Sequence, residues 1–157
     1  MRIEKPYRRR LEGSIDVAAD PDAVFALMCP VREYEWEPGW RTNLIISESG
    51  LVEENCIFMT PAGASEGSDE KSAEAVWVTP MHDRAARRLT MIKVTPDETV
   101  MRLDIAIDAA REGARIRASY EYTALSDEGR RIVDRHTEEN FGILMNRWAS
   151  ALERAIE

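Results

Sequence analysis

Apolar and polar residues alternate over residues 8–17. Leu11, Ile15 and Val17 share one side of the pattern with Gly13, and charged or hydroxyl side chains fall mostly on the other. A period of two is typical of a strand that is buried on one face and exposed to water on the other. This segment is therefore predicted to be a half-buried strand.

The period changes after Asp20-Pro21, where a helix-capping residue precedes a proline at the first helical position. Four apolar residues then recur with helical spacing until Pro30 ends the pattern. A second short helix is predicted over Val31 to Trp36, because Pro30 and Pro38 limit it to about two turns.

Six more strand patterns follow, and short turn sequences separate several of them. The predicted strands are Thr42 to Ser49, Cys56 to Thr60, Glu74 to Met81, Arg88 to Val94, Thr99 to Ala109 and Ala114 to Ala124. Ser49-Gly50, Pro96-Asp97-Glu98 and Arg111-Glu112-Gly113 are short enough for hairpins, so the sheet is expected to be antiparallel. The small, polar and acidic segment Ala62 to Ser72 indicates a mobile loop.

From about Asp127 onward, apolar residues recur every three or four positions, which is typical of an amphipathic helix. The stripe consists of Thr137, Phe141, Leu144, Met145, Trp148, Leu152 and Ala155. We predict one continuous helix of roughly 30 residues, about 45 Å long. Gly142 in its interior costs about 1 kcal/mol relative to Ala, so it marks either close packing or a bend, or is simply tolerated.

These dimensions favour a cavity. Seven strands spaced by about 4.8 Å make a sheet some 34 Å wide, whereas a helix is only about 10 Å across. The sheet must therefore curl around the helix, with the two short helices closing one end. Such a grip tends to leave space between the helix and the concave face of the sheet.

The order of one strand, two short helices, six strands and a long C-terminal helix resembles the START-like, Bet v 1-like superfamily, also called SRPBCC. Locally, Cys29 to Trp36, Pro38-Gly39-Trp40, Ser49-Gly50 and Cys56-Ile57-Phe58 resemble a bacterial subgroup. The resemblance spans nearly the whole chain. It implies an α+β helix-grip fold: a seven-stranded curved antiparallel sheet around a long C-terminal helix, with two short helices between strands 1 and 2. Residues 1–157 would form one such domain.

The resemblance also implies function. Members of this superfamily bind lipids, sterols, polyketides or plant hormones under the C-terminal helix, and some are cyclases, dehydratases or hydroxylase subunits. They share no catalytic motif, so no catalytic residue is carried over to this chain.

The composition and net charge of the chain limit the classes of partner that it can bind. With 44% apolar and 32% charged residues, the 157-residue chain is an ordinary soluble mixture. A net charge of −8 argues against duplex nucleic acid as a partner, and Arg8-Arg9-Arg10 is interpreted as a solvated strand edge. No apolar run is long enough for a signal peptide or a membrane span. We therefore expect a cytoplasmic protein without integral membrane association, with Cys29 and Cys56 as free thiols.

Few residues point to catalysis or to a metal. The sequence contains no glycine-rich phosphate loop, no His pair at metal spacing and no nucleophile elbow. Cys29, Glu33, Cys56 and His82 are metal-ligand types, but Cys is commonly a small core residue, so no metal and no cofactor are predicted. Glu33 would suit acid or base chemistry if it were buried near aromatic rings. The alternative is that it pairs with Arg32 or the backbone while the neighbouring rings pack as a lid.

The candidate ligand-contacting residues are aromatic or lie on the sheet-facing side of the predicted helix. They are Tyr34, Trp36, Trp40, Trp77, Tyr120, Tyr122, Thr137, Phe141 and Met145. We expect them to bind a small, largely hydrophobic molecule. The alternatives are a cyclase- or dehydratase-like enzyme for an aromatic or polyketide substrate, and a co-chaperone-type interaction module. An apolar cavity favours a carrier, convergent ionisable groups an enzyme, and a filled interior with an exposed apolar patch an interaction module.

Overall fold

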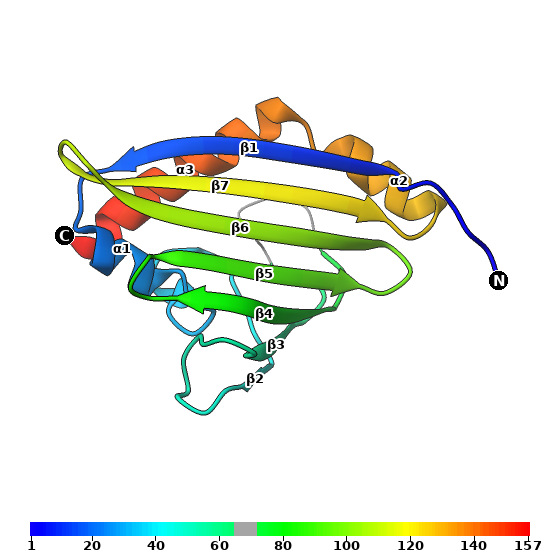
Figure 1. The fold of residues 1–157 in the computed structure, drawn as a ribbon, viewed down its shortest axis with the longest axis horizontal. Coiled ribbons are helices and arrows are strands. Elements are labelled where there is room, and N and C mark those ends of the chain that lie inside the picture. The colour runs from blue at the N-terminus through cyan, green and yellow to red at the C-terminus, as the bar shows by residue number, and fades with distance from the viewer. Residues whose placement is uncertain (65–71) are drawn as a thin grey trace.

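The computed structural model describes residues 1–64 and 72–157 and forms a curved sheet with helices on one face (Figure 1). The strands are β1 (Arg8–Val17), β2 (Leu44–Ile46), β3 (Ile57–Thr60), β4 (Ala75–Asp83), β5 (Arg88–Thr95), β6 (Thr99–Ala110) and β7 (Gly113–Ala124). The helices are α1 (Pro21–Leu27), the 3-10 turn η1 (Glu33–Glu35), α2 (Asp127–Arg135) and α3 (Glu138–Ile156). Most of the loop expected over Ala62 to Ser72, residues 65–71, lies outside the described residues.

All seven strands form one antiparallel sheet in the order β1-β7-β6-β5-β4-β3-β2. The predicted fold class is confirmed: an α+β helix-grip arrangement with two short helical segments between β1 and β2. Strand β1 pairs with β7, the last strand in sequence, so β1 forms one edge of the open sheet and β2 forms the other. Helix α3 lies behind β1 and β7 in Figure 1.

The inward residues of β6 and β7 explain why the alternation in sequence gave correct strands. Leu103 pairs with Tyr120, and Ile107 pairs with Ile116. These four side chains are buried. Because successive side chains alternate between faces, the residues that alternate with this inward set face outward. They include the charged residues Arg102, Asp104, Asp108, Arg115, Arg117 and Glu121. One face of the sheet is thus committed to the core.

The prediction of a single C-terminal helix is wrong, because α2 ends at Arg135 and α3 begins at Glu138. Thr137 caps α3, its hydroxyl accepting a hydrogen bond from the Asn140 N–H at 3.2 Å. From β1, the Arg9 guanidinium donates to the His136 carbonyl at 2.7 Å. The break is therefore stabilised on both sides by caps, and the two helices pack on different parts of the sheet.

Of the alternatives left open for Gly142, the structure supports simple tolerance. Gly142 is exposed, and a Cβ there would meet nothing within 4 Å, so it is simply tolerated. The close approach is on β1 instead. A Cβ on Gly13 would lie 3.0 Å from Phe141 Cε1 and 3.4 Å from Met145 Cγ. The absence of a side chain at Gly13 therefore lets α3 approach the sheet.

No helix in residues 1–64 and 72–157 is long and apolar enough to cross a membrane.

Candidate ligand-binding site

The segment between α1 and β2 places two tryptophan rings inside the grip. Trp36 and Trp40 are buried, and each indole N–H donates to a backbone carbonyl. Trp36 Nε1 lies 3.0 Å from the Leu27 oxygen, and Trp40 Nε1 lies 2.8 Å from the Pro30 oxygen. Both rings are thus fixed by hydrogen bonds to the end of α1 and the residues just after it.

Aromatic side chains of the sheet meet these rings. Phe58 of β3 and Trp77 of β4 are an in-register pair, and their rings stack with centroids 5.2 Å apart at 15°. Trp40 meets both rings edge-on at 6.3 and 6.2 Å. Such edge-to-face and stacked pairs are favourable beyond simple burial. This end of the interior is therefore a tightly interlocked aromatic cluster.

On the helix side, Trp148 of α3 completes the cluster. Its ring lies edge-on to Trp36 at 5.6 Å and 84°, and Tyr120 of β7 touches it at 6.3 Å. The Trp148 Nε1 atom is buried and has no hydrogen-bond partner among the described residues. A buried donor left unpaired costs about 1–3 kcal/mol, so the Trp148 indole nitrogen is an unsatisfied polar atom within the aromatic cluster.

Only a small cavity remains between these rings. Its volume is about 30 Å³, enough for about one water molecule and far below the ~300 Å³ of a ligand pocket. It is lined by Met28, Glu33, Trp36, Trp40, Phe58, Trp77, Leu89, Met91, Leu103, Ile105, Tyr120 and Trp148. Four predicted ligand-contacting residues therefore meet here, at what we call the packed end.

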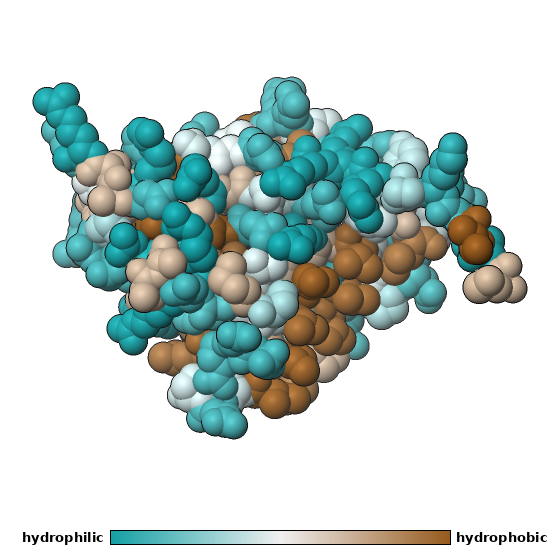
Figure 2. Space-filling model, in the orientation of Figure 1, coloured by the Kyte–Doolittle hydropathy of each residue, from teal (hydrophilic) through white to brown (hydrophobic). Residues whose placement is uncertain are grey.

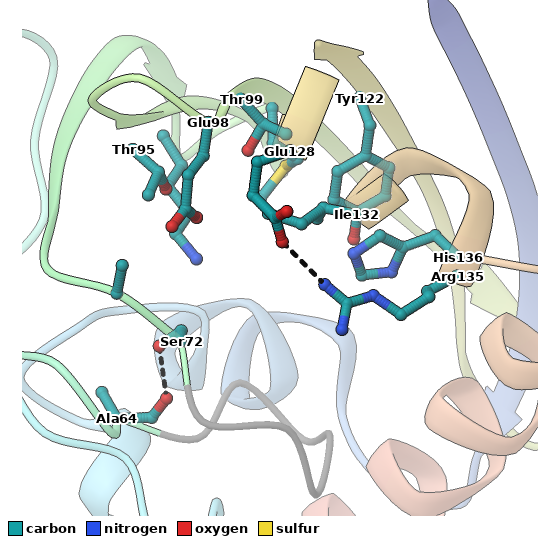
Figure 3. Close-up of a pocket in the computed structure, with 13 residues that line it drawn as sticks. Ala64, Ser72, Thr95, Glu98, Thr99, Tyr122, Glu128, Ile132, Arg135 and His136 are labelled. Carbon is teal, nitrogen blue, oxygen red and sulfur yellow. Dashed lines mark hydrogen bonds and ion pairs between the residues drawn. The ribbon is translucent and has the colours of Figure 1, made fainter. Parts of the chain in front are cut away.

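A much larger hollow lies at the other end of the sheet, beside α2 (Figure 3). Its volume is about 520 Å³, within the ~300–1,000 Å³ range of small-molecule pockets. It is lined by Ala64, Ser72, Ala73, Lys93, Thr95, Glu98, Thr99, Met101, Tyr122, Glu128, Ile132, Arg135 and His136. We call it the α2 chamber.

Backbone contacts hold α2 beside the chamber. Leu125 N–H donates to the Glu98 carbonyl at 2.8 Å, and the Ser126 hydroxyl donates to the Asp97 carbonyl at 2.5 Å. The Ser126 oxygen also accepts from the Gly129 N–H at 3.0 Å, which caps the helix. A Cβ on Gly129 would collide with the Glu98 carbonyl. The first turn of α2 is thus locked to the β5–β6 turn.

The chamber combines apolar and ionic side chains. Glu128 and Arg135 form an ion pair at 3.9 Å with both side chains half exposed, and such pairs contribute about 0–1 kcal/mol (Figure 3). The His136 ring stacks on Tyr122 with centroids 3.9 Å apart at 9°. Met101 and Ile132 supply apolar lining. The chamber therefore offers both aromatic surface and charged groups of either sign.

The chamber and the packed end share a wall. Trp77 and Lys93 are paired across β4 and β5, and the Lys93 ammonium lies 5.4 Å over the Trp77 ring. Tyr120 and Tyr122 follow each other on the same face of β7, with ring centroids 6.1 Å apart. Trp77 and Tyr120 line the small cavity, whereas Lys93 and Tyr122 line the chamber. Neighbouring side chains on β4, β5 and β7 therefore line the two spaces.

The remaining predicted residues lie outside both linings. Tyr34 is exposed, and its hydroxyl accepts from the Thr42 N–H at 2.7 Å. Thr137 caps α3, while Phe141 and Met145 pack over Gly13. Contact between any of these side chains and a ligand stays a prediction.

Sequence reasoning missed the α2 side of the chamber. The predicted continuous helix includes Glu128, Ile132 and Arg135, but its apolar stripe contains none of them. A usable signal existed: Ser126 precedes two acidic residues, as expected at a helix start, and Gly129 permits a close backbone approach.

Glu37 is a second missed residue. It is buried at 3% exposure, and its Oε1 accepts a hydrogen bond from Arg147 of α3 at 3.1 Å. Burial raises the pKa of Glu37, and the Arg147 charge opposes this shift. The pair connects the segment carrying Trp36 and Trp40 to α3.

The residues weighed as metal ligands do not form a centre. Within the described ranges, no three His, Cys, Asp or Glu side chains converge in a way that could hold a metal ion. Cys29 and Cys56 are free and buried, and burial raises the pKa of the Cys56 thiol. His82 stacks on Phe25 at 5.2 Å, and burial lowers its pKa.

No protein-family model matches the sequence, and no curated protein matches it either. Solved structures do match. Norcoclaurine synthase from Thalictrum flavum, as a point mutant with a transition-state analogue, is 14% identical with a TM-score of 0.66, over 97% of this chain and 98% of that one.

Two further structures are similar over nearly their whole length. The ZhuI aromatase/cyclase from Streptomyces sp. R1128 is 16% identical with a TM-score of 0.67, over 96% of this chain and 97% of that one. Ara h 8.0201 is 15% identical with a TM-score of 0.60, over 92% and 98%. The chain therefore has the helix-grip fold of the Bet v 1-like (START-like, SRPBCC) superfamily.

Proposed function

We propose that the protein binds a small, largely hydrophobic molecule in the α2 chamber, between the concave sheet and the C-terminal helices. The observation that carries this proposal is the contrast in volume, about 520 Å³ in the chamber against about 30 Å³ at the packed end. A ligand of drug-like size needs the larger space. The aromatic cluster would then form the closed end of the site.

The lining suggests the kind of ligand. An aromatic or alicyclic body would lie against Tyr122, Met101 and Ile132, which present the ring and apolar surface of the chamber. A polar group on the same molecule would face Lys93 or Arg135 if acidic, and Glu98 or Glu128 if basic. An aromatic ligand is also consistent with a structural neighbour, norcoclaurine synthase, which was solved with dopamine and hydroxybenzaldehyde.

An enzyme is the second candidate, because ionisable groups converge on the chamber. Glu98, Glu128, Lys93 and His136 all line it. In contrast, Glu33 is the one acidic, basic or His side chain among the described residues that line the small cavity. Carboxylates, an amine and an imidazole around one apolar space are suitable for acid and base chemistry. The aromatase/cyclase among the structural neighbours fits this alternative. Turnover of a bound aromatic compound, lost in Glu128→Gln with binding retained, would favour the enzyme.

The proposal is tested by filling the chamber. The probe is anilinonaphthalene sulfonate, whose fluorescence rises in apolar sites, together with native mass spectrometry of the purified protein for a retained ligand. Ile132→Trp would occupy the chamber and should weaken probe binding about tenfold or more, equivalent to ~1.4 kcal/mol. Ile143→Trp is the matched control, because Ile143 is an exposed residue of α3 that lines neither cavity.

Two results would contradict the proposal. The first is a wild-type protein that neither retains a ligand nor binds the probe. The second is equal weakening by both Trp substitutions. Binding that is lost instead in Ile46→Lys, on the outside of the sheet, would place the probe on the outer face and not in the chamber.

A further inference from the structure

The outer, convex face of the sheet carries a continuous apolar surface over β2 to β6. Its members face away from the helices, and we call them the outer apolar patch. They are Leu44, Ile46, Ile57, Met59, Val76, Val78, Ile92, Val94 and Val100. Figure 2 shows hydrophobic side chains gathered on this face in its lower half.

Strand register arranges the patch in two rows. One row runs through Leu44, Met59, Val76, Val94 and Val100, and the other through Ile46, Ile57, Val78 and Ile92. Leu44 is 44% exposed and Ile46 is 55% exposed, while the others are half-buried by their neighbours in the sheet. No charged residue interrupts either row between β2 and β5.

The other half of the same face has the opposite chemistry. Arginines and carboxylates of β1, β5, β6 and β7 pair within and between strands, so this half is covered with ion pairs. They are Arg8–Glu121, Arg10–Glu12, Arg88–Asp108, Arg102–Asp104, Arg115–Asp16 and Arg117–Asp108, at 2.6–3.5 Å. The charged half is typical of a sheet face that is exposed to water, whereas the outer apolar patch exposes hydrophobic side chains on the same face.

The size of the patch can be estimated from sheet geometry. Five strands at about 4.8 Å and two rows about 7 Å apart, with side-chain margins, give an area of about 300 Å². That is the lower end of the range of about 300–600 Å² for the largest apolar patch on a typical monomer, and such patches are often functional. Two such patches in contact would supply about 600 Å² of apolar area, roughly half of a small specific interface of ~1,200 Å². The adjoining ion pairs would form the rim.

We propose that the outer apolar patch is the interface of a reversible homodimer, in which the convex sheets of two copies pack face to face. A two-fold dimer brings the same patch of both copies together, so each patch buries the other. Two sheets pack face to face about 10 Å apart. The modest area implies a dimer that forms at micromolar concentration and dissociates on dilution.

Charge favours a second copy as the occupant. The chain carries a net charge of −8, which opposes an anionic membrane or nucleic acid on any uncharged patch. On the outer face itself, however, the ion pairs named above join six arginines to five carboxylates, with Asp108 bound by two of the arginines. This face is therefore nearly neutral, and two copies can meet here without the like-charge repulsion that their overall charge would cause.

The test is sedimentation equilibrium of the intact protein from ~1 to ~200 µM, where mass action separates monomer from dimer. We expect the average mass to rise from 17.9 kDa towards twice that value. Ile46→Lys should raise the dimer dissociation constant about tenfold or more, and Leu44→Lys should do the same. Ile143→Lys is the matched control, because Ile143 is an equally exposed isoleucine at 57% but lies on α3.

Circular dichroism of each variant checks that the sheet is intact. A protein that stays monomeric up to the highest concentration overturns the proposal, as does a dimer that Ile143→Lys dissociates as readily as Ile46→Lys. A monomer that binds phosphatidylcholine vesicles through Ile46 would assign the patch to a lipid surface, and also overturns it. None of these outcomes affects the chamber, whose binding is measured separately with Ile132→Trp.

Discussion

The two ends of the space beneath the C-terminal helices are built in different ways. At the packed end, hydrogen-bonded tryptophans fill the interior and leave about 30 Å³. At the α2 chamber, the helix is held at its first turn by backbone contacts, and about 520 Å³ stays open. A wide sheet covered by narrow helices leaves space between the two layers. In this protein, side chains fill that space at the packed end but not at the α2 chamber.

The largest expected effect is at the packed end. Trp40→Ala removes a ring that touches Phe58 and Trp77 and leaves the Pro30 carbonyl without its donor. Loss of a buried Trp costs about 3–5 kcal/mol, because transfer and cavity terms add. Urea unfolding measures it. Tyr34→Ala is the control, since Tyr34 is 53% exposed, and it should cost clearly less. A Trp40→Ala loss no larger than this control would show that the aromatic cluster does not stabilise the fold.

A smaller effect is expected at the lock between α2 and the β5–β6 turn. Gly129→Ala places a methyl group against the Glu98 carbonyl, so α2 must shift, at a cost of about 1–3 kcal/mol. Gly142→Ala is the matched control in α3, where the space is open, and should stabilise by about 0.5–1 kcal/mol through helix propensity. Thermal unfolding of both variants gives the comparison. If both glycines respond alike, the backbone lock is not what holds the chamber.

These two sites also show how far sequence can go. The strands were predictable because alternation with a period of two reports a half-buried sheet directly, as in β6 and β7. The helix break was not recognised, although Thr137 followed by Glu138 and Glu139 is a helix-start pattern, because the apolar stripe continues across it. At the packed end, Trp36, Trp40, Trp77 and Tyr120 could be selected from the sequence as candidate ligand-contacting residues because they are aromatic.

The chamber could not be predicted in the same way. Lys93, Thr95 and Glu98 look like ordinary solvated strand-end residues in sequence, and only the docking of α2 over them makes them line a space. The volume that remains at the packed end depends on how the aromatic rings pack against one another, as in the 15° stack of Phe58 on Trp77. The orientation of a ring cannot be predicted from the sequence pattern. The outer apolar patch likewise requires strand register across five strands.

The smallest expected effect is on the pH dependence of the free energy of unfolding, and it distinguishes the ion pair at the packed end from the ion pair beside the chamber. Glu37 and Arg147 pair at the packed end, where the Glu37 side chain is 2% exposed, whereas Glu128 and Arg135 pair beside the chamber with both side chains 53% exposed. Burial raises the pKa of Glu37 above its ordinary value of 4.5. The folded protein therefore binds a proton more readily than the unfolded chain, and this contribution to stability is lost as the pH rises through the raised pKa.

The measurement is the difference in free energy of unfolding between wild type and Glu37→Gln, at neutral pH and at about pH 5, just above the ordinary carboxyl pKa. Acidification should make the wild type more stable relative to Glu37→Gln, because protonation removes the cost of a buried charge. Glu128→Gln is the control for an exposed pair, which contributes about 0–1 kcal/mol, and its difference should change less. A wild type that loses stability relative to Glu37→Gln on acidification would mean that the attraction of Arg147 outweighs burial. The packed end would then be held by its ion pair as well as by its rings.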